Sequence, residues 1–231
     1  MEMKDFLIKK GLDPSYSELF DRMTALTLEW NEKINVTAIR EPSEFMQKNV
    51  MDSLALFGAP ELAAARDILD MGTGGGYPGL PLAAVCPEKN FVLTDAIGKK
   101  LRVVDDVAAQ LGLSNVRTMH SRAEDLGHDP EYRESFDLVV SRAVADLSVL
   151  SEYCLPLVRR GGSFIAYKTD SSKEEIEAAK PAIGKLGGRL AENRPDGIEG
   201  SGHIFVVIEK RSATPNIYPR KAGLPSKKPL R

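Results

Sequence analysis

The sequence predicts an α/β fold in which helices cover both faces of a mostly parallel, seven-stranded sheet. From residue 66 onward, short apolar segments alternate with helical segments, as is typical of parallel sheets. The link between the last two apolar segments, residues 195–202, is too short for a helical crossover, so the last strand is expected to run antiparallel. A glycine-rich turn after the first strand indicates a ligand-binding edge at the carboxyl ends of the strands.

The first 60 residues are predicted to form a helical extension. Residues 14–30 carry apolar side chains at spacings of three and four, from Tyr16 to Trp30, as in an amphipathic helix. A polar connection follows over residues 31–40, and Pro42 opens a second helix that continues toward Leu56. The sequence Gly58-Ala59-Pro60 separates this extension from the sheet.

The strands and helices of the sheet are located from the same patterns. Strands are expected at residues 67–71, 91–94, 115–120, 136–141, 162–167, 189–194 and 203–209. The clearest helices between them are residues 98–111, 146–157 and 172–186. We therefore divide the chain into an N-terminal extension (1–60), a sheet domain (61–210) and a C-terminal tail (211–231).

Composition indicates an ordinary globular protein with reduced cysteines. The hydrophobic and charged fractions are 42% and 28%, and no apolar run is long enough to span a membrane. The N-terminus lacks the pattern of a secretory signal. Cys86 and Cys154 lie far apart in expected helices, so buried thiols are favoured over a disulfide. We expect a cytoplasmic protein with no membrane partner.

The charges are distributed unevenly along the chain. Residues 210–231 hold seven basic residues and no acidic one, whereas the other 209 residues hold 24 basic against 33 acidic ones. Four prolines exclude a helix over most of this segment. A basic, extended tail suits contact with phosphates, and a solvated, disordered end is an equal alternative.

The turn over residues 70–79 carries the strongest functional signal. Gly74, Gly76 and Gly79 have the spacing of a nucleotide-cofactor turn, in which glycines let a ligand approach backbone N–H groups. Asp95 ends the second strand, where a carboxylate can accept hydrogen bonds from both ribose hydroxyls. The sequence therefore predicts a nucleoside-containing cofactor.

Asp70 distinguishes between the possible cofactors. A carboxylate just before the glycines repels a pyrophosphate but attracts the ammonium group of S-adenosylmethionine, whose carboxylate can meet the helix N–H groups. A turn-capping acid is the alternative role for Asp70. After the third strand, Ala123 and Glu124 suit contact with adenine, although Glu124 equally suits a capping role.

Several segments together resemble one known family. Asp52-Ser53, Asp95 with Lys99-Lys100 and residues 35–40, 70–81, 121–124 and 141–143 are similar to the bacterial ribosomal RNA small subunit methyltransferase G family, formerly called glucose-inhibited division protein B. The tail over residues 214–230 is similar to a version common in Gram-positive members. The resemblance covers nearly the whole chain, and the combination is far more specific than the glycine turn alone.

The resemblance implies a Rossmann-like class I methyltransferase that uses S-adenosylmethionine. Its implied product is 7-methylguanine in a functional loop of 16S ribosomal RNA, within the small subunit or its precursor. The cofactor contacts that it implies are Gly72, Tyr77, Asp95, Ala96, Ile97, Ala123, Glu124 and Arg142, to which the glycine turn itself adds Asp70, Gly74 and Gly76. Members often have a His shortly before the Asp-Ser pair, where this chain has Lys48-Asn49, and we interpret this as variation.

No catalytic acid or base is expected. Guanine N7 carries a lone pair and no proton, so catalysis is expected to come from holding it in line with the methyl group. The three histidines, His120, His128 and His203, are scattered along the chain and indicate no metal site. Because N7 faces the deep groove of an RNA helix, the target is expected in a loop or flipped out.

Basic residues are the candidates for an RNA-binding surface. Lys99, Lys100 and Arg102 begin a helix beside the expected cofactor site, although a solvated helix face is nearly as good an interpretation. The other candidates are Arg40 and the tail residues Arg220, Lys221, Lys227 and Lys228. Arg142 is expected to position the cofactor or the guanine, with a salt bridge across the sheet edge as the alternative.

Two other functions stay open at this point. An NAD(P)-dependent oxidoreductase has a related sheet, but Asp70, the antiparallel last strand and the lack of a proton-relay residue disfavour it. A non-catalytic ribosome-binding module is compatible with the basic tail.

Overall fold

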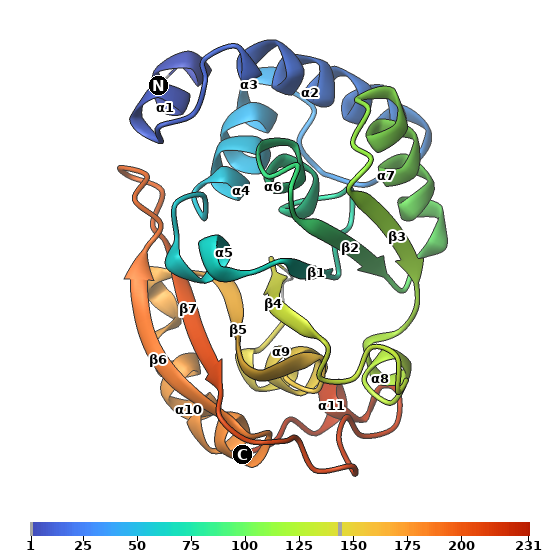
Figure 1. Ribbon diagram of the computed structural model, residues 1–231, viewed down its shortest axis with the longest axis vertical. Coiled ribbons are helices and arrows are strands. Elements are labelled where there is room, and N and C mark those ends of the chain that lie inside the picture. The colour runs from blue at the N-terminus through green and yellow to red at the C-terminus, as the bar shows by residue number, and fades with distance from the viewer. Residues whose placement is uncertain (1, 143–144) are drawn as a thin grey trace.

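The protein contains the predicted seven-stranded sheet. The computed structural model describes residues 2–142 and 145–231. Its strands are β1 (Asp67–Met71), β2 (Asn90–Asp95), β3 (Val116–His120), β4 (Phe136–Ser141), β5 (Val158–Thr169), β6 (Gly188–Pro195) and β7 (His203–Lys210). Their order is β3-β2-β1-β4-β5-β7-β6 (Figure 1). Neighbours from β3 to β5 are parallel, whereas β7 is antiparallel to β5 and β6, which confirms the prediction for the last strand.

Helices cover both faces of the sheet, as predicted (Figure 1). Successive residues of a strand point to opposite faces, so Ile68 belongs to one hydrophobic core and Leu69 to the other. The first core lies under α6 (Gly79–Val85), α7 (Gly98–Gln110) and the N-terminal helices. The second lies under α9 (Leu147–Cys154) and α10 (Lys173–Lys185). The remaining short elements are α5 (Pro60–Ala64), α8 (Ala123–Leu126), η2 (Asp170–Ser172) and α11 (Leu224–Lys227).

The N-terminal extension packs on the sheet domain. Phe6 of α1 (Met3–Lys9) and Phe20 of α2 (Tyr16–Lys33) are buried in the same core as Leu80 and Val104. Burying one such side chain stabilises the fold by about 1.5–3 kcal/mol. A hydrogen bond also orients α2 relative to α7, because Trp30 Nε1 donates to Asp106 Oδ2 of α7 at 2.6 Å.

The predicted second helix is interrupted in its middle. It consists of α3 (Pro42–Phe45), a π-helical segment η1 (Met46–Met51) and the short α4 (Asp52–Leu54). The hydroxyl of Ser53 donates to the backbone oxygen of Asn49, and Tyr167 Oη of β5 donates to the Ser53 oxygen at 3.1 Å. A π-helix is rare and is frequently found at functional sites.

The C-terminal tail is ordered, and its interpretation as a disordered end is wrong. Lys210 and Thr214 are buried, and the Arg133 guanidinium donates to the Thr214 and Tyr218 oxygens at 2.7 and 2.9 Å. Arg220 donates to both oxygens of the fully buried Glu152 at 2.6–3.1 Å. The tail therefore crosses α8 and α9 before it ends. Among the described residues, no helix is long and apolar enough to cross a membrane.

Candidate functional site

A cavity of about 320 Å³ lies at the carboxyl ends of β1 to β4, where the sequence predicts a ligand. We call it the strand-end cavity. Five predicted cofactor residues line it, namely Gly72, Asp95, Ala96, Ala123 and Glu124. Met71, Leu150 and Ala145 give it apolar walls, while the two carboxylates stand at its polar edge. A small apolar cleft with a few placed polar groups is the usual form of a cofactor site.

The glycines of the turn serve two different purposes. Gly72, Gly74 and Gly76 have φ angles of +73°, +60° and +99°, which favour glycine. A Cβ on Gly76 would lie 2.3 Å from Leu80, and one on Gly79 would lie 2.9 Å from Asp70 Oδ2, so these two glycines are needed for packing. A Cβ on Gly74 would have no neighbour within 4 Å. The open side of the turn is therefore at Gly74.

Asp70 lies beneath this turn and is fully buried. Its Oδ2 accepts from Thr73 Oγ1 at 2.6 Å and from the Gly79 N–H at 2.9 Å, which is the capping arrangement considered above. Its Oδ1 has no partner among the described residues. Burial raises the pKa of Asp70 to about 6. The structure thus gives Asp70 a capping role, and contact with a cofactor ammonium stays a prediction.

Asp95 is held at the wall of the strand-end cavity by two backbone donors. Oδ2 accepts from the Gly74 N–H at 3.0 Å, and Oδ1 accepts from the Ile97 N–H at 2.8 Å. Each carboxylate oxygen keeps a further lone pair for a ligand. Ile97, the residue after the lining Ala96, is 44% exposed and does not itself line the cavity.

The C-terminal tail forms one wall of the strand-end cavity. Gly223 and Ser226 line it, and the Gly223 N–H donates to Glu124 Oε1 at 2.8 Å. The hydroxyls of Ser226 and Tyr153 of α9 are 3.0 Å apart. The sequence does not predict these tail contacts, because nothing in a basic, proline-rich segment indicates which part of the sheet it will contact.

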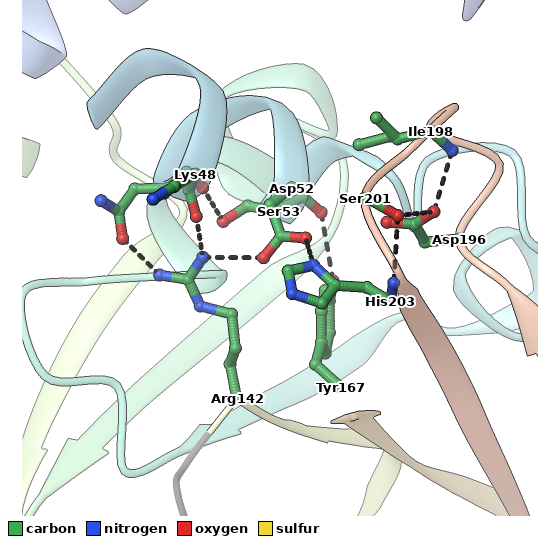
Figure 2. Close-up of polar contacts among 10 residues, drawn as sticks. Lys48, Asp52, Ser53, Arg142, Tyr167, Asp196, Ile198, Ser201 and His203 are labelled. Carbon is green, nitrogen blue, oxygen red and sulfur yellow. Dashed lines mark hydrogen bonds and ion pairs between the residues drawn. The ribbon is translucent and has the colours of Figure 1, made fainter. Parts of the chain in front are cut away.

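Arg142 reaches from the end of β4 to the π-helical segment (Figure 2). Its guanidinium donates to the Lys48 oxygen at 2.8 Å, to Asp52 Oδ2 at 3.0 Å and to Asn49 Oδ1 at 2.6 Å. The alternative interpretation of Arg142 as a salt-bridge residue thus describes the structure, and its cofactor contact stays a prediction. Asn49 supplies an acceptor to the same guanidinium.

The side chain of Tyr77 points away from the strand-end cavity. Its hydroxyl lies 3.0 Å from Thr27 Oγ1 of α2, and its ring packs edge-on against Phe45. Arg142 stands over the same ring at 6.0 Å. Tyr77 therefore fastens the N-terminal helices to the glycine turn. A cofactor contact at this position would have to come from its backbone.

His203 lies beside two carboxylates, which its position in the sequence did not indicate. The ligand atoms of His203, Asp52 and Asp196 lie within 4.8 Å of one another. His203 Nδ1 is 2.7 Å from Asp52 Oδ1, and because a carboxylate only accepts, Nδ1 carries the proton. Asp52 is already bonded to Arg142 and His203, so within this group only Asp196 keeps a carboxylate oxygen without a partner among the described residues.

The predicted RNA-binding residues divide into two groups. Arg40, Lys99, Arg102, Lys221, Lys227 and Lys228 are exposed, and Lys100 is half-buried. Arg220 is different, because its ion pair with Glu152 uses the guanidinium inside the fold. We therefore withdraw Arg220 from the RNA-binding surface.

Comparisons with known proteins decide the family. A family model described as rRNA small subunit methyltransferase G matches residues 17–193. The chain belongs to this methyltransferase family. A methyltransferase G of Clostridium novyi is 46% identical over 94% of this chain and 90% of its own length. Those of Clostridium tetani and Desulfitobacterium hafniense are 44% and 45% identical, over 96% and 88% of this chain and 93% and 84% of their own lengths.

Solved structures agree on the fold. The S-adenosylmethionine-dependent methyltransferase SibL superposes with a TM-score of 0.57 at 16% identity, over 76% of this chain and 60% of its own. A putative O-methyltransferase from Klebsiella pneumoniae gives 0.55 at 15% identity, over 82% and 90%. At such identities the likeness establishes a class I methyltransferase fold for this member of the methyltransferase G family.

Proposed function

We propose that this chain transfers a methyl group from S-adenosylmethionine to N7 of a guanine in 16S ribosomal RNA. The observation that carries the proposal is the strand-end cavity, in which the glycine turn and Asp95 meet, in a chain that is 46% identical to a named methyltransferase G. The small ribosomal subunit or its precursor is the expected substrate.

The residues of the strand-end cavity fit the cofactor. Asp95 would accept from the ribose hydroxyls, since both of its oxygens keep a lone pair. Ala96, Ile97, Ala123 and Glu124 would surround the adenine, and the open turn at Gly74 would meet the amino-acid end. When bound, S-adenosylmethionine supplies an electrophilic methyl group on a sulfonium.

The chain needs no proton-transfer group for this reaction. Because N7 of guanine is unprotonated at neutral pH, its lone pair could take the methyl group directly as the methyl–sulfur bond breaks, with neutral S-adenosylhomocysteine as the leaving group. The contribution of the protein is then to hold the two reactants in line and to exclude water, and alignment alone can lower a barrier by up to about 7–11 kcal/mol. This agrees with the position of Asp70, which is used in a capping role instead of proton transfer.

The two alternatives predict different measurements. Calorimetry on the cofactor-free protein should show saturable heat with S-adenosylmethionine and none with NADH, whereas an oxidoreductase requires the reverse. Mass mapping of 16S RNA from cells that lack the gene should reveal one unmethylated guanine. Incubation with the purified protein and S-adenosylmethionine should methylate that guanine. A fully methylated RNA in those cells would contradict the enzyme proposal and leave a binding module.

A further inference from the structure

A second and larger cavity lies on the other side of Arg142 from the strand-end cavity. It has a volume of about 720 Å³ and opens between the end of α1, the π-helical segment and the turn that joins β6 to β7. We call it the Asp52 cavity. Its lining includes Asp52, Met51, Ile198, Glu199, His203 and Lys48. None of the predicted cofactor residues lines it.

The polar wall of the Asp52 cavity is held rigidly (Figure 2). The Asp52 carboxylate is only 8% exposed and is fixed between Arg142 at 3.0 Å and His203 at 2.7 Å. The backbone of the next residue, Ser53, accepts from Tyr167 Oη at 3.1 Å. The carboxylate is thus held by His203 of β7 and by Arg142, which follows β4, while Tyr167 of β5 holds the adjacent backbone. This is the support that a recognition group requires.

Buried polar atoms without partners gather around the same network. Among the described residues, Asn49 Nδ2 and Asp196 Oδ2 are two of five such side-chain atoms. Asn49 contacts Arg142, and the Asp196 carboxylate belongs to the cluster with Asp52 and His203. Together with the π-helical Met46–Met51, this is a costly arrangement that packing alone does not require.

The walls of the two cavities are connected through neighbouring residues at the end of β4. Ser141 lines the strand-end cavity, and the next residue, Arg142, bonds to Asp52 of the second cavity. A group that emerges from the Asp52 cavity toward Ser141 therefore faces the cofactor site.

We propose that the Asp52 cavity holds the methyl-accepting guanine, flipped out of the RNA, with Asp52 and Glu199 accepting hydrogen bonds from its Watson–Crick edge. This inference rests on the proposed function. Guanine presents two adjacent donors there, N1–H and N2–H, and is the base that best matches carboxylate acceptors. Met51 and Ile198 supply apolar surface for the ring, and Lys48 stands at the wall for a flanking phosphate.

This orientation explains which nitrogen is methylated. N7 lies on the edge of guanine opposite to N2, so a base whose Watson–Crick edge is bound inside the cavity presents N7 outward. In the proposed orientation N7 would point toward the end of β4, where Ser141 lines the strand-end cavity. The Asp52 cavity would thus select both the base and the atom.

Replacement of the target guanine by inosine tests the contact directly. Inosine lacks the N2 amino group but keeps N7, so kcat/KM of the wild-type protein on the substituted RNA should fall about 10- to 100-fold, the usual effect of a hydrogen bond to a charged group. Glu199→Gln and Asp52→Asn should each lower kcat/KM on the guanine RNA by a similar factor. In at least one of these two variants, replacing the target guanine by inosine should then lower kcat/KM little further.

Three readouts keep the test decisive. Glu199 is exposed on a turn, so its variant should melt like the wild type, and affinity for S-adenosylmethionine should stay within twofold in both variants. Glu174→Gln, an exposed acid on α10, is the matched control and should behave as wild type with both RNAs. Loss of cofactor affinity, or an inosine effect that is undiminished in both variants, would overturn the inference. A wild type that methylates neither RNA nor subunit would instead refute the proposed function.

Discussion

At the scale of single residues, Asp70 shows how one carboxylate serves the architecture of the cofactor turn. One oxygen closes the turn through Thr73 and Gly79, and the other is buried with no partner in the part of the chain that the structure describes. Ionising a carboxylate in such a place is costly, and this is why burial raises the pKa of Asp70 to about 6. The hydrogen bonds of Asp70 therefore hold the turn, while its ionisation at neutral pH lowers the free energy of unfolding.

Asp70→Asn should remove a pH dependence of stability. Because the folded pKa of about 6 exceeds the ordinary value of 3.8, the folded state holds this proton more tightly. The resulting stabilisation is complete below pH 3.8 and is lost as the pH rises through 6. Relative to the variant, the wild type should lose about 3 kcal/mol of unfolding free energy over this window. Urea unfolding of both proteins between pH 4 and 7.5 measures the difference, and parallel curves would contradict it.

At the scale of elements, the C-terminal tail links the outside of the fold to the cofactor site. Its anchors, Thr214 and Arg220, precede the two residues that reach the strand-end cavity, Gly223 and Ser226. The tail can therefore be shortened without losing its anchors, so its contribution to the cavity can be measured separately from its contribution to stability.

Ending the chain at Ala222 should weaken cofactor binding. Glu124 loses the Gly223 N–H, and the cavity loses one wall, so affinity for S-adenosylmethionine in calorimetry should fall about tenfold, the effect of one hydrogen bond to a charged group. Ending the chain at Lys227 keeps both wall residues and should leave the affinity within twofold. Equal affinities in the two truncated proteins would show that the wall has no such role.

At the scale of the whole molecule, local patterns determined the sheet but not the contacts between distant segments. Strand positions and the antiparallel β7 follow from apolar periodicity and one short link, both of which are local in the sequence. The pairs Arg220–Glu152 and His203–Asp52 join residues 68 and 151 positions apart. In the sequence, Glu152 looks like an ordinary polar helix position. No sequence pattern therefore predicts that it is buried and forms an ion pair with Arg220, which leaves Arg220 outside the basic surface.

Two of the exposed basic residues, Lys99 and Lys221, lie close in the sequence to residues that line the strand-end cavity. Ala96, just before Lys99 on α7, and Gly223, just after Lys221, line the same cavity. Lysines at these two positions are suited to hold an RNA strand across the opening. The proposed RNA-binding surface thus combines the segments around Lys99 and Lys221, which are 122 positions apart in the sequence.

Reversing both charges should separate RNA binding from cofactor binding. In Lys99→Glu/Lys221→Glu, affinity for small ribosomal subunits should fall at least tenfold at about 0.1 M salt, and the slope of log affinity against log salt should become shallower by about 1–2, as expected for one or two lost phosphate contacts. Calorimetry with S-adenosylmethionine should be unchanged, because neither lysine lines the cavity. Lys173→Glu/Lys180→Glu on α10 is the control of equal charge and should keep the wild-type slope. An identical loss in both double variants would mean that only net charge matters, and the strand-end opening would not be the place where RNA is held.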